Sequence, residues 1–248
     1  MKYYGITDRG LVRRNNQDSY VIATNEAGDV FAIVADGIGG NLGGDIASRM
    51  AVAHFSKVFS ENSGFSSAEE VRAWVSANVS EANRQIFMYG RDHAELKGMG
   101  TTFCGVIFTK LGRFVINIGD SRAYAWFKDG TLRLLTRDHN LVNDMILHGE
   151  LTVEQAKNYP HRNVLTNALG VWETVRSDID QHCEEMEGIL ICSDGLHGYV
   201  SGMQIASVLN DKSGDPVLRA KKLMKCALEA GGYDNITIVL IDLEGDDR

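Results

Sequence analysis

The 248-residue sequence is poor in the residues that mark disulfide-rich, membrane-spanning and proline-rich proteins. It has two prolines and four dispersed cysteines with no Cys-x-x-Cys pair: Cys104, Cys183, Cys192 and Cys226. This pattern disfavours a disulfide framework or a cysteine zinc site, and the apolar context of three of the cysteines favours buried, reduced thiols. No apolar run approaches the roughly 20 residues that cross a bilayer, so we expect no membrane partner.

Basic residues are also too few for a general nucleic-acid binder. The chain has 25 lysines and arginines against 33 aspartates and glutamates, a formal net charge of −8, and no basic run offsets it. A phosphate backbone would be repelled, so we expect no nucleic-acid partner. Residues 1–6 lead directly into a strand-like run without the basic and apolar segments of a signal peptide. We therefore expect a cytoplasmic protein.

What the sequence does contain is a repeated association of carboxylates with the ends of strand-like runs. A single Asp-Gly is more often an ordinary turn than part of a site. Here five carboxylates share the setting: Asp18, Asp36, Asp120, Asp194 and Asp234. Converging carboxylates repel one another unless positive charge is supplied, and a neighbouring glycine lets a backbone carbonyl approach an ion. The pattern predicts a site for Mg²⁺ or Mn²⁺, which prefer oxygen ligands.

Strands outnumber helices in the predicted secondary structure. Strand-like runs cover residues 19–24, 30–35, 101–109, 114–118, 123–127, 132–135, 188–192 and 236–243. Lys128-Asp129-Gly130 is typical of a hairpin, so much of the sheet should be antiparallel. Long helices are predicted over residues 44–59, from Ser66 or Ser67, and from Asp215-Pro216 to Gly231-Gly232. This order predicts a single α+β domain over residues 1–248 and not alternating βαβ units.

Residues 140–162, named the flap segment here, interrupt the strand pattern. The segment is polar and contains two short helical pieces, at 141–147 and 152–157, the second with Thr152 and Gln155 as a capping pair. It is either a plain connection or a functional lid, and the sequence leaves both interpretations open.

The glycine-rich residues 37–44 do not form a nucleotide-binding motif. They lack the Gly-Lys-Ser/Thr ending of a P-loop, and Leu42 occupies the third glycine position of a dinucleotide fingerprint. Their place directly after Asp36 indicates instead a backbone that approaches a metal ion and then opens a helix.

Nucleophilic catalysis by a cysteine is also excluded. A cysteine-dependent phosphatase needs an arginine six positions after the nucleophile, and those positions hold Lys110, Ile189, Gly198 and Gly232. Among the seven histidines, His54 and His148 lie in helical pieces and are interpreted as structural or exposed. Three others lie near the motifs and stay open as minor candidates: His139, His161 and His197.

A series of motifs extends over nearly the whole chain. They are residues 13–19, 34–40, 100–102, 118–124, 135–139, 163–170, 193–196 and 233–237. In this order they resemble the metal-dependent protein Ser/Thr phosphatases of type 2C, of the compact bacterial kind. The resemblance implies a four-layer α-β-β-α sandwich, with two mainly antiparallel sheets flanked by helices and a metal cluster at one edge.

The resemblance also implies roles for individual carboxylates. Asp36 would bridge two central Mn²⁺ or Mg²⁺ ions, and the Gly37 carbonyl would contribute to one of them. Asp194 and Asp234 would bind the second ion. Asp18 would complete its surroundings, directly or through water.

Further roles follow from the same resemblance. Asp120 would hold a weaker third ion together with Asp194, Arg13 would bind the substrate phosphate, and Asn235 would support Asp234. Ile38 stands where many eukaryotic members have a histidine that is proposed as the general acid, so that role does not carry over. Tyr159-Pro160 and Asn167 replace the His-Pro pair and the arginine that are common in bacterial relatives, so substrate contacts there are not implied.

The favoured hypothesis is hydrolysis of phosphoserine and phosphothreonine on cytosolic proteins by a metal-activated water, which reverses the action of a Ser/Thr protein kinase. No covalent phosphoenzyme is needed, which agrees with the lack of an activated nucleophile. The alternative is a non-catalytic metal-binding signalling module of the same fold. The acidic composition disfavours a nuclease, the third candidate.

Overall fold

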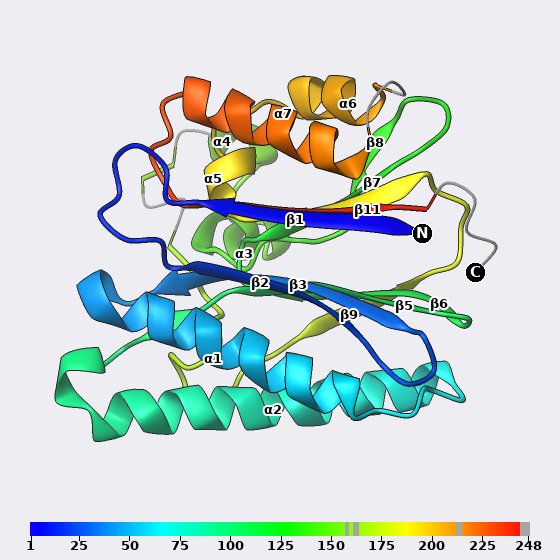
Figure 1. The fold of residues 1–248 in the computed structure, drawn as a ribbon. Helices are drawn as coiled ribbons and strands as arrows, with labels where there is room; N and C mark the ends of the chain where they lie inside the picture. Colours follow the sequence, from blue (N-terminus) through cyan, green and yellow to red (C-terminus); the bar gives the residue numbers. More distant parts are fainter. Residues whose placement is uncertain (157–158, 161–163, 212–214, 244–248) are drawn as a thin grey trace.

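The chain folds into two antiparallel β-sheets packed face to face, with helices on both outer faces (Figure 1). The computed structural model describes residues 1–156, 159–160, 164–211 and 215–243. The first sheet has the strand order β1-β11-β10-β7-β8, and the second has the order β2-β3-β5-β6-β9 with β4 paired to β3. This arrangement confirms the predicted α-β-β-α sandwich.

The strands of the two sheets are short and mostly buried. The first sheet contains β1 (Lys2–Asp8), β7 (Arg122–Trp126), β8 (Leu132–Leu134), β10 (Gly188–Cys192) and β11 (Ile236–Asp242). The second contains β2 (Asp18–Thr24), β3 (Val30–Ile38), β4 (Gly100–Thr101), β5 (Phe103–Thr109), β6 (Gly112–Ile118) and β9 (Asp178–His182).

Each outer face of the sandwich is covered by a pair of helices. The helices α1 (Gly40–Ser60) and α2 (Ala68–Asp92) cover the second sheet, and α6 (Gly202–Leu209) and α7 (Pro216–Glu229) cover the first (Figure 1). Ser67 caps α2 by accepting a hydrogen bond from Glu70 N, and Asp215 caps α7 in the same way. These caps confirm the predicted helix starts.

Strand β3 shows how one strand contributes both to the core beneath the helices and to the core between the two sheets. Successive side chains of a strand point to opposite faces. Phe31 and Ile33 pack among the side chains of α1 and α2, whereas Ala32 and Val34 pack between the sheets. All four are fully buried, so this strand stabilises both layers at once.

Several boundaries differ from the sequence prediction. β3 continues through Asp36 to Ile38, α1 begins within the glycine-rich run at Gly40, and the run 101–109 breaks at Thr102. Strand β9 and helix α6 were not predicted, because β9 is a polar edge strand and α6 has only eight residues. The other short helices are η1 (Ala94–Leu96) and α5 (Asp194–His197).

The flap segment leaves the sandwich between β8 and β9. Its helices α3 (Leu141–Leu147) and α4 (Val153–Ala156) lie behind the sheets in Figure 1. Thr152 and Gln155 form the predicted capping pair. Residues 157–158 and 161–163, which include the end of the predicted second helix and His161, lie outside the described residues.

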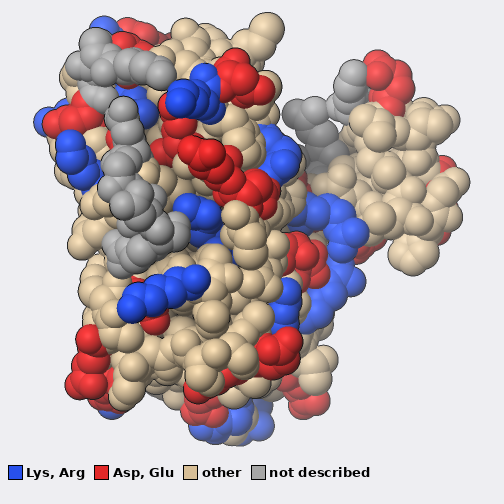
Figure 2. Space-filling model, turned by 90° about the vertical axis from the view of Figure 1, so that its right-hand side faces the viewer, with Lys and Arg blue, Asp and Glu red and all other residues tan. Residues whose placement is uncertain are grey.

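Two expectations about composition can be compared with the structure. Cys104 and Cys192 are buried, but Cys183 is exposed and Cys226 is partly buried, so burial was correctly predicted for only two thiols. Among the described residues, no helix combines the length and apolar character that crossing a bilayer requires. Acidic and basic side chains are interspersed on the face shown in Figure 2.

Candidate active site

Antiparallel pairing brings the five predicted carboxylates to one edge of the sandwich. Asp18 begins β2 and lies opposite Asp36 near the end of β3. Asp120 follows β6, and Asp194 follows β10 as the first residue of α5. Asp234 precedes β11, so the prediction that it follows a strand was wrong. The start of one strand meets the end of its antiparallel neighbour, and the grouping is therefore kept.

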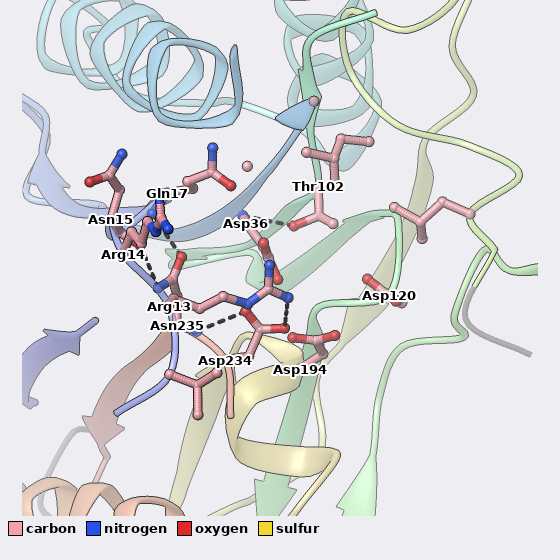
Figure 3. Close-up of a pocket in the computed structure, with 15 residues that line it drawn as sticks. Arg13, Arg14, Asn15, Gln17, Asp36, Thr102, Asp120, Asp194, Asp234 and Asn235 are labelled. Carbon is pink, nitrogen blue, oxygen red and sulfur yellow. Dashed lines mark hydrogen bonds and ion pairs between the residues drawn. The ribbon is translucent and has the colours of Figure 1, made fainter. Parts of the chain in front are cut away.

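The carboxylates meet at an open cleft of about 540 Å³. Asp36, Asp120, Asp194 and Asp234 line it together with Arg13, and Figure 3 shows these side chains directed toward a common space. Further lining residues come from the loop before β2, from the end of β3 and from the glycine that follows it: Val12, Arg14, Asn15, Gln17, Gly37, Ile38 and Gly39.

Asp18 lies beneath this cleft and is only 7% exposed. Its Oδ2 accepts hydrogen bonds of 2.7 Å from Ser193 Oγ and Thr237 Oγ1, while Oδ1 is buried and has no hydrogen-bond partner among the described residues. Burial raises the pKa of Asp18 to about 6, and the charge of Asp194 adds to the rise. A buried anionic oxygen without a partner is costly, so this position calls for a positive charge.

Three half-buried carboxylates that line the cleft are also destabilised in their charged form. Burial, followed by the charges of neighbouring carboxylates, raises the pKa of Asp36 well above its usual value. The same causes raise the pKa of Asp120 to about 7 and that of Asp194 to about 6. The Oδ1 atom of Asp194 is also buried, and the described part of the chain offers it no hydrogen-bond partner. These groups fit hard divalent cations, which would neutralise them and occupy the free oxygens.

Arg13 and Asn235 complete the charged edge of the cleft. Arg13 Nη2 donates a 2.6 Å hydrogen bond to Asp234 Oδ2 (Figure 3). Asn235 supports Asp234 through its main-chain N–H, which donates to Asp234 Oδ1. In the described part of the chain, no three carboxyl, imidazole or thiol groups stand at the spacing of a preformed metal site, so the carboxylates would have to close in around a cation.

The side chain of Asn235 also holds the loop before β2 in place. Its Oδ1 accepts from Gln17 N at 2.8 Å, and its Nδ2 donates to the carbonyl oxygens of Arg9 and Asn15 at 2.8 and 2.9 Å. Asn235 therefore fixes the loop that carries Arg13. This role was not predicted from the sequence.

The glycine-rich run serves close packing. A methyl group placed at Gly37 would lie 2.1 Å from the Gly44 carbonyl oxygen and 2.6 Å from that of Gln17. Gly37 N also donates to Gln17 O at 3.2 Å. Only glycine fits where the end of β3, the first turn of α1 and the loop before β2 meet.

Comparison with known proteins decides the family. The family model described as "Protein phosphatase 2C" matches residues 12–228. The chain belongs to this family. The match confirms the resemblance inferred from the motifs and, with it, the assignment of the chain as a protein serine/threonine phosphatase.

Individual relatives match over almost their full lengths. The chain is 37% identical over 237 residues to the serine/threonine phosphatase stp of Listeria welshimeri, which covers 95% of this chain and 93% of the relative. The solved S. agalactiae serine/threonine phosphatase superposes with a TM-score of 0.89 at 36% identity, covering 96% of this chain and 98% of that chain.

A second solved structure bears on the cofactor. It is the catalytic domain of the serine threonine protein phosphatase PstP, described as a complex with two manganese ions. It superposes with a TM-score of 0.80 at 30% identity and covers 97% of both chains. Together with the family, it supports the use of divalent cations.

Two polar residues of the phosphatase connect the carboxylates and were assigned no role from the sequence. Asp36 N donates to Thr102 Oγ1 at 2.9 Å, and Thr102 N donates to Asp36 O at 2.8 Å. Thr102 Oγ1 also lies 2.7 Å from Ser121 Oγ, beside Asp120. His197 Nε2 lies 2.9 Å from the Asp120 carbonyl oxygen, and burial lowers the pKa of His197 to about 4, so the ring is neutral and donates this bond. The available signals were the motif at residues 100–102, which contains Thr102, and the place of His197 beside the motif at residues 193–196, which had made it a minor candidate.

A second cleft of the phosphatase, of about 400 Å³, lies between the flap helices and the body. It shares Asp120 and Asp194 with the first cleft, so the two clefts adjoin at these carboxylates. Val142, Ile146 and Ala156 line its flap side. The flap segment thus borders the carboxylate cluster.

Proposed function

We propose that this phosphatase hydrolyses phosphoserine and phosphothreonine esters in cytoplasmic proteins with Mn²⁺ or Mg²⁺, and that residues 1–248 act as one catalytic domain. The observation that carries the proposal is the cluster of carboxylates with raised pKa values and unpartnered oxygens beside an arginine-lined cleft. Its substrates would be phosphoproteins produced by a Ser/Thr protein kinase.

In this proposal the carboxylates hold two central cations. Asp36 would lie between them with the Gly37 carbonyl nearby, Asp194 and Asp234 would bind the second, and Asp18 would contribute through its free Oδ1 or through water. Asp120 and Asp194 would hold a weaker third ion. Bound at this place, the cations would lower the pKa of water and neutralise phosphoryl oxygens during in-line attack.

Arg13 is the residue suited to bind the phosphoryl group. In this structure its guanidinium pairs with Asp234 Oδ2, an oxygen that would be a ligand of a bound cation. A guanidinium released from this pair stays at the cleft, where its planar fork can donate two charge-assisted hydrogen bonds to one phosphate. Arg14 also lines the cleft, but among the described residues it forms no ion pair with a carboxylate of the cluster.

Protonation of the leaving alkoxide needs a group other than the histidine of many eukaryotic members. Ile38 lines the cleft at that position, and no histidine is among the described residues that line it. We therefore assign this step to a solvent molecule in the cleft or to a more distant group.

The decisive assay is phosphate release from a phosphothreonine peptide, with and without Mn²⁺ and after chelation with EDTA. The proposal expects turnover that requires the cation and is lost with EDTA. Activity that survives EDTA would contradict the cation mechanism. Binding of Mn²⁺ without phosphate release from any phosphoester would instead support the non-catalytic module.

A further inference from the structure

The imidazole of His139 is fully buried next to the turn that carries Asp120. His139 N donates to Gly119 O at 2.9 Å, and Gly119 N donates back to His139 Nδ1 at 3.3 Å. Asn167 Nδ2 also donates to Nδ1, at 2.8 Å. Because Nδ1 accepts, Nε2 carries the proton and donates to Asp178 Oδ2 at 3.1 Å. Four hydrogen bonds therefore fix this ring and its main chain.

The turn that His139 holds is sterically constrained. Gly119 has a φ of +104°, and a methyl group there would lie 2.7 Å from Thr102 Cγ2. Asn117 Nδ2 donates to Gly119 O at 3.2 Å, and His197 holds the carbonyl of Asp120 from the other side. The direction of the Asp120 side chain therefore depends on the contacts of Gly119.

His139 also stands where the two ends of the flap segment meet. Thr166 N donates to His139 O at 3.0 Å, Asn140 pairs with Leu165 as a β-bridge, and Leu141 N donates to Val164 O at 2.9 Å. The imidazole does not line the cleft, so it is placed to act through Gly119 and not on substrate.

We propose that His139 is a positioning residue for Asp120, and that the hydrogen-bond acceptor at its Nδ1 sets the affinity of the weaker cation site. This inference rests on the proposed function for the role of Asp120. Groups that orient a metal ligand typically change metal affinity or activity by roughly 10- to 100-fold when they are lost. His139 thus belongs to the site although it does not contact substrate.

Two substitutions separate the two ring nitrogens. His139→Asn places an amide oxygen near the position of Nδ1, where it can accept from Gly119 N. His139→Gln places its amide near Nε2, toward Asp178, and leaves Gly119 N without that acceptor. We expect His139→Gln to weaken the low-affinity Mn²⁺ site about 10- to 100-fold in calorimetric titration while the tight sites are unchanged. His139→Asn should retain most of the weak-site affinity, and Asp120→Ala marks its complete loss.

His182→Asn is the matched control. His182 lies at the opposite end of β9 from Asp178, opposite Arg113, and bonds to Glu184. The His182→Asn variant should bind Mn²⁺ at the tight sites and at the weak site with unchanged affinity. Equal weakening by all three histidine variants would indicate a general loss of stability and would overturn the proposal.

An unchanged weak-site affinity in folded His139→Gln would also overturn the proposal. If that variant does not fold, Asn167→Leu provides the test, because it removes the shorter of the two hydrogen bonds that hold Nδ1 toward Gly119 and leaves the ring free to turn away; no weakening of the low-affinity site there refutes the inference. Mn²⁺ titration does not depend on turnover. A wild type that titrates as expected but releases no phosphate from p-nitrophenyl phosphate or phosphopeptides would therefore refute only the proposed function.

Discussion

Asp18→Asn should stabilise the cation-free protein while impairing the enzyme. Burial raises the pKa of Asp18 to about 6 from a usual value of 3.8, so at pH 7.5 its charged form opposes folding. A difference of about two pKa units corresponds to about 3 kcal/mol. The asparagine oxygen can still accept from Ser193 and Thr237, but its amide nitrogen replaces the unpartnered Oδ1, and a buried polar group without a partner costs about 1–2 kcal/mol.

The net expectation is a gain of about 1–2 kcal/mol in the free energy of unfolding, or about 2–8 °C in Tm for a chain of this size. The gain should depend on pH in a defined direction. A carboxyl whose pKa is raised in the folded state contributes stability below its unfolded pKa and loses it as pH rises through the folded pKa. The advantage of Asp18→Asn should therefore develop between about pH 4 and pH 6 and be absent at pH 4.

Thermal unfolding in EDTA at pH 7.5 and pH 4 measures this effect. In saturating Mn²⁺ the order should reverse, because cations that bind the native state stabilise the wild type more than the variant. Asp129→Asn is the control: Asp129 is exposed and its pKa is lowered by hydrogen bonds from Thr131, so its loss should not stabilise. A lower Tm for Asp18→Asn in EDTA at pH 7.5, or an advantage that persists at pH 4, would refute the electrostatic reasoning.

Four further outcomes are expected. Arg13→Ala should lower kcat/KM about 10- to 100-fold, which corresponds to about 1.5–3 kcal/mol. Arg13→Lys should recover part of this loss. A larger effect of Arg14→Ala on the KM of a small phosphoester would move the phosphate-binding role from Arg13 to Arg14. Asp36→Asn should lower kcat by several orders of magnitude, and near-normal turnover at saturating Mn²⁺ would contradict its bridging role. Thiol alkylation should leave activity nearly intact, since burial raises the thiol pKa of Cys104 and Cys192, and neither Cys183 nor Cys226 is among the described residues that line the cleft. Ile146→Ala in the flap segment should change rates on phosphoproteins but not on p-nitrophenyl phosphate, and equal loss on both would count against a selective flap.

The fold could be predicted where local signals agree with packing. The helices with Ser67 and Asp215 caps and the strands with apolar runs were found because capping and burial pointed to the same boundaries. Helix α6 carried a readable signal that was not used, the capping box of Ser201 and Gln204. Strand β9 carried little signal, because its residues are mostly polar and its pairing with β6 is a contact that only the folded chain brings about.

The site could be predicted as a set of residues but not as a network. Asn235 follows Asp234, so local support was readable from adjacency. Its side chain, however, fixes the loop that carries Arg13, through contacts with residues more than 200 positions away. The acceptor role of His139 depends likewise on Asn167 and Gly119, which only the folded chain brings together. Motifs identify the positions of the site residues in the sequence, whereas tertiary contacts determine where their side chains point.

The distribution of the carboxylates between the two sheets links stability to chemistry. Asp18 and Asp36 belong to the second sheet, and Asp120 follows one of its strands; Asp194 and Asp234 adjoin strands of the first. Asp18 already joins the sheets by accepting from Thr237 on β11. The mutual repulsion of the carboxylates therefore acts across the interface between the two sheets. Burial of the apolar side chains between the sheets, such as Val34 and Val239, opposes this repulsion. Cations bound by this set would reverse that repulsion at the same edge, because their ligands come from both sheets. Neither sheet alone supplies all five carboxylates, so the site exists only because the two sheets pack against each other.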